Sequence, residues 1–223
     1  MTIASRLLEI KKALPVGVTL VAVSKTKPVE DILEAYEAGQ RIFGENKIQE
    51  MSDKFEVLPR DIQWHMIGHV QTNKVKYMAP FVSLIHGVDS FRLLREIDKQ
   101  AKRNERVIPC LLQVYIADEE SKFGLEESEL DEILSSPALR ELKNIKIVGL
   151  MAMATFTDDQ TKIKGEFDHL NTIFHRVQLQ YKELENVDFK ELSIGMSNDY
   201  ITAISSGSTM IRIGSTIFGS RNY

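Results

Sequence analysis

The sequence predicts an α/β protein in which eight short parallel strands close into a single (β/α)8 TIM barrel, with an extra helix at the N-terminus. Short β-rich apolar segments alternate with longer amphipathic segments, and strands separated by helices must run parallel. The length of 223 residues lies near the lower end of the range for this fold. No linker, low-complexity segment or charge block divides the chain, so we expect one domain over residues 1–223.

The elements follow from local signals. An amphipathic helix over 3–14 opens the chain and ends at Pro15, and the β-rich segment 19–24 forms the first buried strand. Pro28 begins the next helix, which Gly39 ends. The later strands are expected at 41–43, 62–67, 82–86, 107–116, 145–151, 189–194 and 210–213. The later helices are expected at 46–57, from 71, at 90–104, 126–135, 159–185 and 198–205, with a closing turn at 217–219.

An open, doubly wound sheet is the alternative arrangement of such units. A doubly wound sheet that binds a dinucleotide has a glycine-rich turn after its first strand. Here that turn reads Ser-Lys-Thr-Lys-Pro over 24–28 and contains no glycine, which favours the barrel.

Composition excludes several function classes. A net charge of −4 without a basic cluster argues against nucleic-acid binding, and the apolar runs are too short for a membrane helix. The single cysteine, Cys110, is expected in the core and fits a reducing compartment. No Cys/His cluster has zinc spacing, and the amphipathic start lacks the pattern of a signal peptide. We therefore expect a cytoplasmic protein without a metal site.

Lys25 is the strongest candidate for chemistry, because active sites of barrels lie at the C-terminal ends of the strands. Strand alternation places it on the face of Val21 and Val23, at the barrel mouth. An amine attacks an aldehyde only when neutral, and burial or nearby cations such as Lys27 or Lys74 would lower its pKa. Position alone leaves a solvated lysine as the more ordinary interpretation.

The loops after the seventh and eighth strands suggest a phosphate site. Gly195-Met-Ser197-Asn opens a short helix, and Gly214-Ser215-Thr216 follows the last strand. Glycine backbone, free N–H groups and hydroxyls bind oxyanions, and these two loops often do so in TIM barrels. Helix capping by Ser197 is the alternative.

Other polar residues at strand ends have less specific patterns. Arg212 alternates with isoleucines and is expected to point into the barrel, where it would pair with an acidic residue or a ligand. His65 is expected to form a hydrogen bond at the mouth or to touch ligand, and its spacing to His69 is a weak metal signal. Five further assignments complete the set: Glu45 and Asn46 as strand-end candidates, Lys122 as another, His86 as structural, Met151 and Met153 as core, and Asp118 to Glu120 as a solvated loop.

Together these segments resemble the pyridoxal phosphate homeostasis protein family, single-domain relatives of the alanine racemase barrel. The resemblance covers about Leu20 to Tyr223. The segments that carry it are 22–28 (AVSKTKP), 43–46 (FGEN), 64–69 (WHMIGH), 71–74 (QTNK), 122–124 (KFG), 149–151 (GLM), 195–199 (GMSND), 207–214 (GSTMIRIG) and 217–219 (IFG).

The resemblance implies that pyridoxal 5′-phosphate (PLP), a form of vitamin B6, is held as a Schiff base on Lys25. Asn46 and His65 would lie beside the cofactor, and Arg212 would face the pyridine nitrogen. The phosphate would be held by Ser197, Gly214 and Ser215, with Thr216 near it. The chain departs from the family pattern in having Ser215 for threonine and Met66 for phenylalanine. The serine keeps the hydroxyl, so phosphate binding should persist.

The same resemblance implies a PLP carrier acting in intracellular PLP and amino-acid homeostasis without a dedicated reaction. An arginine at the pyridine nitrogen disfavours its protonation and weakens the ring as an electron sink. Related racemases add a tyrosine base from a second domain, which is not expected here. A weak amino-acid racemase and a Schiff-base aldolase acting on a sugar phosphate remain alternatives. PLP-dependent apo-enzymes are possible partners, and a monomer is expected.

Overall fold

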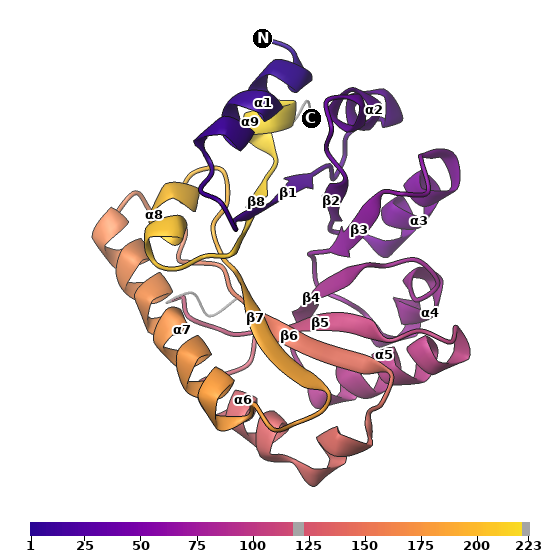
Figure 1. Ribbon diagram of the computed structural model, residues 1–223, viewed down its shortest axis with the longest axis vertical. Coiled ribbons are helices and arrows are strands. Elements are labelled where there is room, and N and C mark those ends of the chain that lie inside the picture. The colour runs from indigo at the N-terminus through magenta and orange to yellow at the C-terminus, as the bar shows by residue number, and fades with distance from the viewer. Residues whose placement is uncertain (118–122, 220–223) are drawn as a thin grey trace.

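The computed structural model describes residues 1–117 and 123–219, and its eight parallel strands form a closed barrel in the order of the sequence (Figure 1). β8 closes the barrel by pairing with β1, with Arg212 opposite Val21. The predicted (β/α)8 fold is therefore confirmed. The strands are β1 (Thr19–Val23), β2 (Ile42–Glu45), β3 (Gln63–Met66), β4 (Leu84–Val88), β5 (Ile108–Gln113), β6 (Ile145–Met151), β7 (Val187–Ser193) and β8 (Met210–Ile213).

Helices surround the barrel, and the extra N-terminal helix is present. They are α1 (Ile3–Ala13), α2 (Val29–Glu37), α3 (Ile48–Val57), α4 (Val75–Met78), α5 (Phe91–Arg103), α6 (Glu127–Ser135), α7 (Gln160–Gln180), α8 (Tyr200–Ser205) and α9 (Ser215–Phe218), with 3-10 turns η1 (Thr72–Lys74) and η2 (Pro137–Glu141). The helices α1 and α9 lie together (Figure 1), and Arg6 of α1 donates to the carbonyl of Ile217 in α9 at 2.6 Å. No helix in the described ranges is long and apolar enough to cross a membrane.

Several element bounds differ from the expected ones. The helix expected from 71 is only η1 followed by one turn, α4, which ends just before Pro80. The fifth strand ends at Gln113, and the backbone of Leu125 then hydrogen-bonds both Gln113 and Tyr115. The helix expected over 159–185 ends at Gln180, and the closing turn is the short helix α9.

Apolar side chains pack in two regions. A small cluster fills the barrel interior and includes Val21, Leu84 and Met151, with Met153 packed against it. A much larger cluster lies between the strands and the helices. Cys110 is fully buried there, as expected, and burial raises the pKa of its thiol. Alternate strand residues point into one cluster or the other, and the polar residues at the strand ends lie beyond both clusters, at the barrel mouth.

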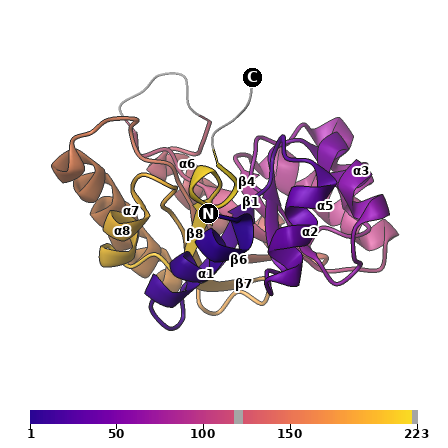
Figure 2. The ribbon, with the colours of Figure 1, turned by 90° about the horizontal axis from the view of Figure 1, so that it is seen from above.

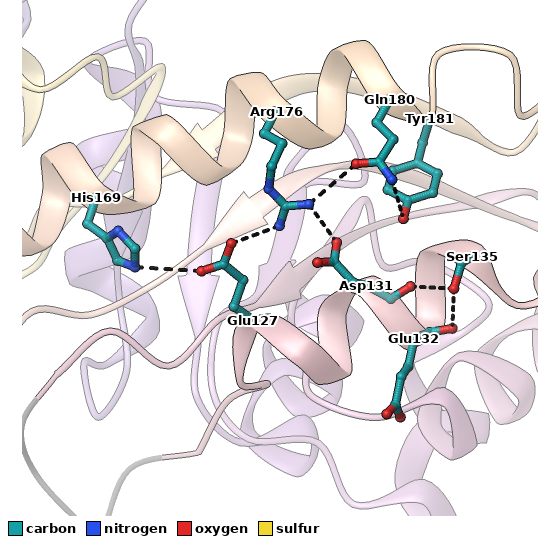
Figure 3. Close-up of polar contacts among 8 residues, drawn as sticks. All are labelled: Glu127, Asp131, Glu132, Ser135, His169, Arg176, Gln180 and Tyr181. Carbon is teal, nitrogen blue, oxygen red and sulfur yellow. Dashed lines mark hydrogen bonds and ion pairs between the residues drawn. The ribbon is translucent and has the colours of Figure 1, made fainter.

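The helices also interact outside the barrel. Figure 2 shows α7 and α8 together on one flank of the molecule and α2, α3 and α5 on the other. Arg176 of α7 reaches two carboxylates of α6, Glu127 at 2.9 Å and Asp131 at 2.8 Å (Figure 3). These groups are about one-third exposed or more, so solvent screens the pairs and each adds little stability.

Candidate functional site

Lys25 lies in a tight turn at the C-terminal end of β1. The backbone N–H of Lys27 donates to the carbonyl of Ser24 at 3.0 Å and closes a four-residue β-turn. Lys25 and Thr26 are the corners of this turn, and Lys25 is half-buried. Thr26 has a φ of 63°, in the left-handed region that β-branched residues rarely adopt. Strain of this kind persists only where the surrounding structure holds it.

A buried ion-pair cluster from β2 and α3 holds the turn. The ammonium of Lys54 donates to the carbonyl of Ser24 at 2.8 Å, to Glu45 at 2.7 Å and to Glu50 at 2.7 Å. Glu50 also accepts from the backbone N–H of Thr26 at 2.5 Å, and the Ser24 hydroxyl donates to Glu45 at 2.6 Å. The residue before and the residue after the candidate lysine are therefore both fixed.

Sequence reasoning missed this cluster. Lys54 shares the buried face of α3 with Ile48 and Met51. A lysine at an apolar position of the helix was therefore the signal in the sequence that could have indicated a buried ion pair. Glu45 is fully buried, and burial raises the pKa of its carboxyl, although Lys54 opposes the shift. Its Oε2 atom is buried without a hydrogen-bond partner among the described residues. The pairing with Lys54 is thus the main compensation for burying this carboxylate.

Asn46 and His65 follow on the next two strands. Asn46 comes directly after β2 and is partly buried. Its backbone touches Gly68, where any Cβ would collide with the Asn46 carbonyl, so this glycine allows the two loops to approach. His65 is buried on β3, and its Nδ1 lies 3.0 Å from Nε2 of His86 on β4. The expected hydrogen bond of His65 at the mouth is therefore present.

Arg212 points into the barrel, as strand alternation predicted. Its guanidinium donates to the carbonyl and the hydroxyl of Ser193, both at 2.7 Å, and to the carbonyl of Ala152 at 3.0 Å. Burial lowers its pKa to about 10, with Asp199 opposing the shift, so it stays cationic at neutral pH. Among the described residues its hydrogen bonds go to neutral oxygens, and no acidic side chain lies within ion-pair distance.

The two glycine-containing loops meet as predicted. The backbone N–H of Gly214 donates to the hydroxyl of Ser197 at 3.4 Å, across 17 positions of sequence. Ser197 therefore does not cap α8, which begins at Tyr200. Ser215 and Thr216 open α9 with exposed side chains. Hydroxyls and backbone N–H groups are thus available at the mouth for an oxyanion.

Other candidates lie apart from this group. His69 pairs with Asp89 at 3.1 Å and stacks on Phe123, so it does not face His65. Lys27 donates to the carbonyl of Phe218, and Lys74 lies over the ring of Tyr77. Lys122 and the segment 118–120 lie outside the described residues. Among those described, no group of three His, Cys, Asp or Glu side chains could hold a metal ion.

These residues suit an aldehyde that carries a phosphate. Lys25 supplies an amine, Ser215 and Thr216 supply exposed oxyanion donors, and Arg212 supplies a buried cation. Among the described residues, none accepts a hydrogen bond from Nε of Arg212, so the guanidinium keeps a donor for a ligand.

The chain is similar in sequence and fold to several known proteins. The family model described as alanine racemase, N-terminal domain, matches residues 2–222. The pyridoxal phosphate homeostasis protein of Aquifex aeolicus is 40% identical over 205 residues, which are 92% of this chain and 87% of that protein. The structure of PipY from Synechococcus elongatus PCC7942 with PLP bound is 36% identical, with a TM-score of 0.89 over 98% of this chain and 100% of that one. An alanine racemase from Clostridium difficile shares the fold, with a TM-score of 0.76 at 13% identity. The match includes 100% of this chain and 57% of the racemase chain.

Proposed function

Because this chain belongs to the family of the alanine racemase N-terminal domain, we propose that it binds PLP as a Schiff base on Lys25 and serves in PLP homeostasis. The observation that carries the proposal is the strained turn that presents Lys25 at the barrel mouth. Proteins keep such strain where function needs a fixed side chain. The homeostasis role is supported by relatives of that name at 40% and 37% identity.

Different residues around the mouth would bind different parts of the cofactor. Lys25 would hold the aldehyde carbon, while Ser197, Gly214, Ser215 and Thr216 would bind the phosphate. Asn46 and His65 would line the ring, and Arg212 would face the pyridine nitrogen. When bound, the cofactor supplies an electron-withdrawing ring. A cationic Arg212 disfavours a proton on the ring nitrogen and so keeps that withdrawal weak.

A carrier role fits the acid–base properties of the site better than racemisation does. Racemisation needs a second group that exchanges a proton near neutral pH. Burial lowers the pKa of His65 to about 3, so its imidazole takes up a proton only weakly. Interconversion of amino-acid enantiomers by the PLP-loaded chain is therefore expected to be absent, and clear interconversion would support a weak racemase.

The same proposal includes delivery of PLP to PLP-dependent apo-enzymes, a role in amino-acid homeostasis, a cytoplasmic location and a monomeric state. The lone, fully buried Cys110 supports a reducing compartment. Transfer to an apo-enzyme is measured by its recovered activity when the PLP-loaded chain is the sole source of PLP. Size-exclusion chromatography with light scattering decides the oligomeric state.

The Schiff base is tested by absorbance and trapping. PLP added to the protein is expected to give a visible band that borohydride abolishes, and mass spectrometry should place the pyridoxyl group on Lys25. Lys25→Ala should lose this band. Lys146→Ala is the matched control, because Lys146 lies at the opposite end of the barrel in an exposed pair with Asp188. A sugar adduct on Lys25 would favour the aldolase, and an unmodified Lys25 would refute the proposal.

A further inference from the structure

Four polar side chains form a continuous hydrogen-bonded chain across the barrel interior. His65 on β3 contacts His86 on β4 at 3.0 Å, His86 contacts Ser193 on β7 at 3.0 Å, and Arg212 on β8 donates to Ser193 at 2.7 Å. All four are buried, with exposed fractions of 4% or less. A buried chain of this kind must satisfy donors and acceptors together.

The cationic end fixes the direction of every bond in the chain. A guanidinium has only donors, so the Ser193 hydroxyl oxygen accepts from Arg212. The single hydroxyl hydrogen of Ser193 then has one described acceptor, Nδ1 of His86. His86 must therefore carry its hydrogen on Nε2, and it donates this hydrogen to Nδ1 of His65.

The same logic sets the state of His65. Its Nδ1 is an acceptor, so its hydrogen is on Nε2, which has no hydrogen-bond partner among the described residues. Within residues 1–117 and 123–219, the buried side-chain nitrogen and oxygen atoms without a partner are Glu45 Oε2, Trp64 Nε1 and Ser206 Oγ, so Nε2 of His65 is not sealed in the core. Its N–H is available to a ligand at the barrel mouth.

We propose that Ser193 and His86 are positioning residues that hold His65 as a neutral Nε2–H donor toward the bound ligand. The chain then ends in a donor on both sides, the guanidinium of Arg212 and the imidazole N–H of His65. A ligand seated against it must present acceptors to both. An unprotonated pyridine nitrogen and a deprotonated ring oxygen have this chemistry, and this part rests on the proposed binding of PLP.

The electrostatics agree with neutral rings. Burial lowers the pKa of His65 to about 3, and burial with Arg212 nearby lowers the pKa of His86 well below its usual value. A cationic His86 would donate from both nitrogens and would stand near a second buried cation. The neutral, directional chain avoids that cost.

The tautomers are measured by long-range proton–nitrogen correlation spectra of the ¹⁵N-labelled full chain, with and without added PLP. In the wild type, both rings should be neutral Nε2–H tautomers, and the Nε2–H of His86 should exchange slowly with water. Ser193→Ala removes the donor to His86 Nδ1, so both rings should become tautomer mixtures and the slow exchange should be lost. The Kd for PLP should rise about tenfold, as expected for one lost hydrogen bond.

Ser208→Ala is the matched control, because Ser208 is also a buried serine between β7 and β8 but bonds only backbone carbonyls. It should leave both tautomers unchanged. An Nδ1–H or cationic ring in the wild type would overturn the proposal, and this holds even if Ser193→Ala fails to fold. Unchanged rings in Ser193→Ala would also overturn it. Loss of PLP binding with the predicted tautomers intact would instead refute only the proposed function.

Discussion

Replacing Lys54 by methionine tests the ion-pair cluster that holds the Lys25 turn. Methionine matches the length of the lysine stem and removes only the ammonium. Glu50 is 23% exposed and can turn to water, whereas Glu45 is fully buried and cannot. Removing one partner of a buried ion pair costs about 3–5 kcal/mol, and the partial exposure of Glu50 favours the lower value, about 3 kcal/mol.

Urea unfolding at 25 °C and pH 7 measures this loss as a lower midpoint at an unchanged m-value. Lys99→Met is the control, because Lys99 forms an exposed pair with Glu96 and should cost less than about 0.5 kcal/mol. Adding Glu45→Gln to Lys54→Met should recover stability, since the unpaired carboxylate is gone. A loss below about 1 kcal/mol for Lys54→Met would refute the reasoning.

The stability lost in Lys54→Met should also depend on pH. The pKa of Glu45 is already raised by burial, and without Lys54 it rises further. A group whose pKa is higher in the folded state favours folding as the pH falls, because the folded state takes up the proton first. The difference between wild type and Lys54→Met should therefore shrink from pH 7 to pH 5. In the same variant, PLP should label Lys25 more slowly in the borohydride trapping assay, since the turn loses its hydrogen bond from Lys54.

Three further outcomes are expected. The folded pKa of His65 is about 3 against 6.5 when unfolded, so only the unfolded state takes up a proton between these values. His65 alone should therefore lower stability by about 2 kcal/mol from neutral pH to pH 5, in addition to the loss from His86, whose pKa is also lowered by burial, and His65→Gln should reduce the slope in urea titrations. Thr26→Gly should raise stability by about 0.5–1 kcal/mol by relieving the left-handed conformation, and a lower thermal midpoint would contradict this. Gly149→Ala should lower stability by more than about 3 kcal/mol, because a Cβ would collide with the carbonyl of Glu191. Gly165→Ala, in open space on α7, should instead raise stability by about 0.5–1 kcal/mol, and calorimetry of both variants measures the contrast.

The sequence by itself determined the fold and the position of the main candidates. The alternation of strands and helices specified a parallel barrel, and parallel strands bring their C-terminal ends to one mouth. Lys25, Ser197 and Gly214 could therefore be placed at that mouth from strand ends alone, and Arg212 could be turned inward by alternation. These features depend on local periodicity, which the chain carries in its order of residues.

Only the tertiary structure decided the partners of the buried polar groups. His86 joins His65 across 21 positions and Ser193 across 107, and Lys54 reaches Ser24 across 30. Such pairs depend on the register of neighbouring strands and on which helix face turns inward, and barrel closure sets both. A buried charge or imidazole is stable only where a partner lies within hydrogen-bond distance. The sequence therefore placed the candidate lysine, and the folded barrel supplied the residues that hold its turn.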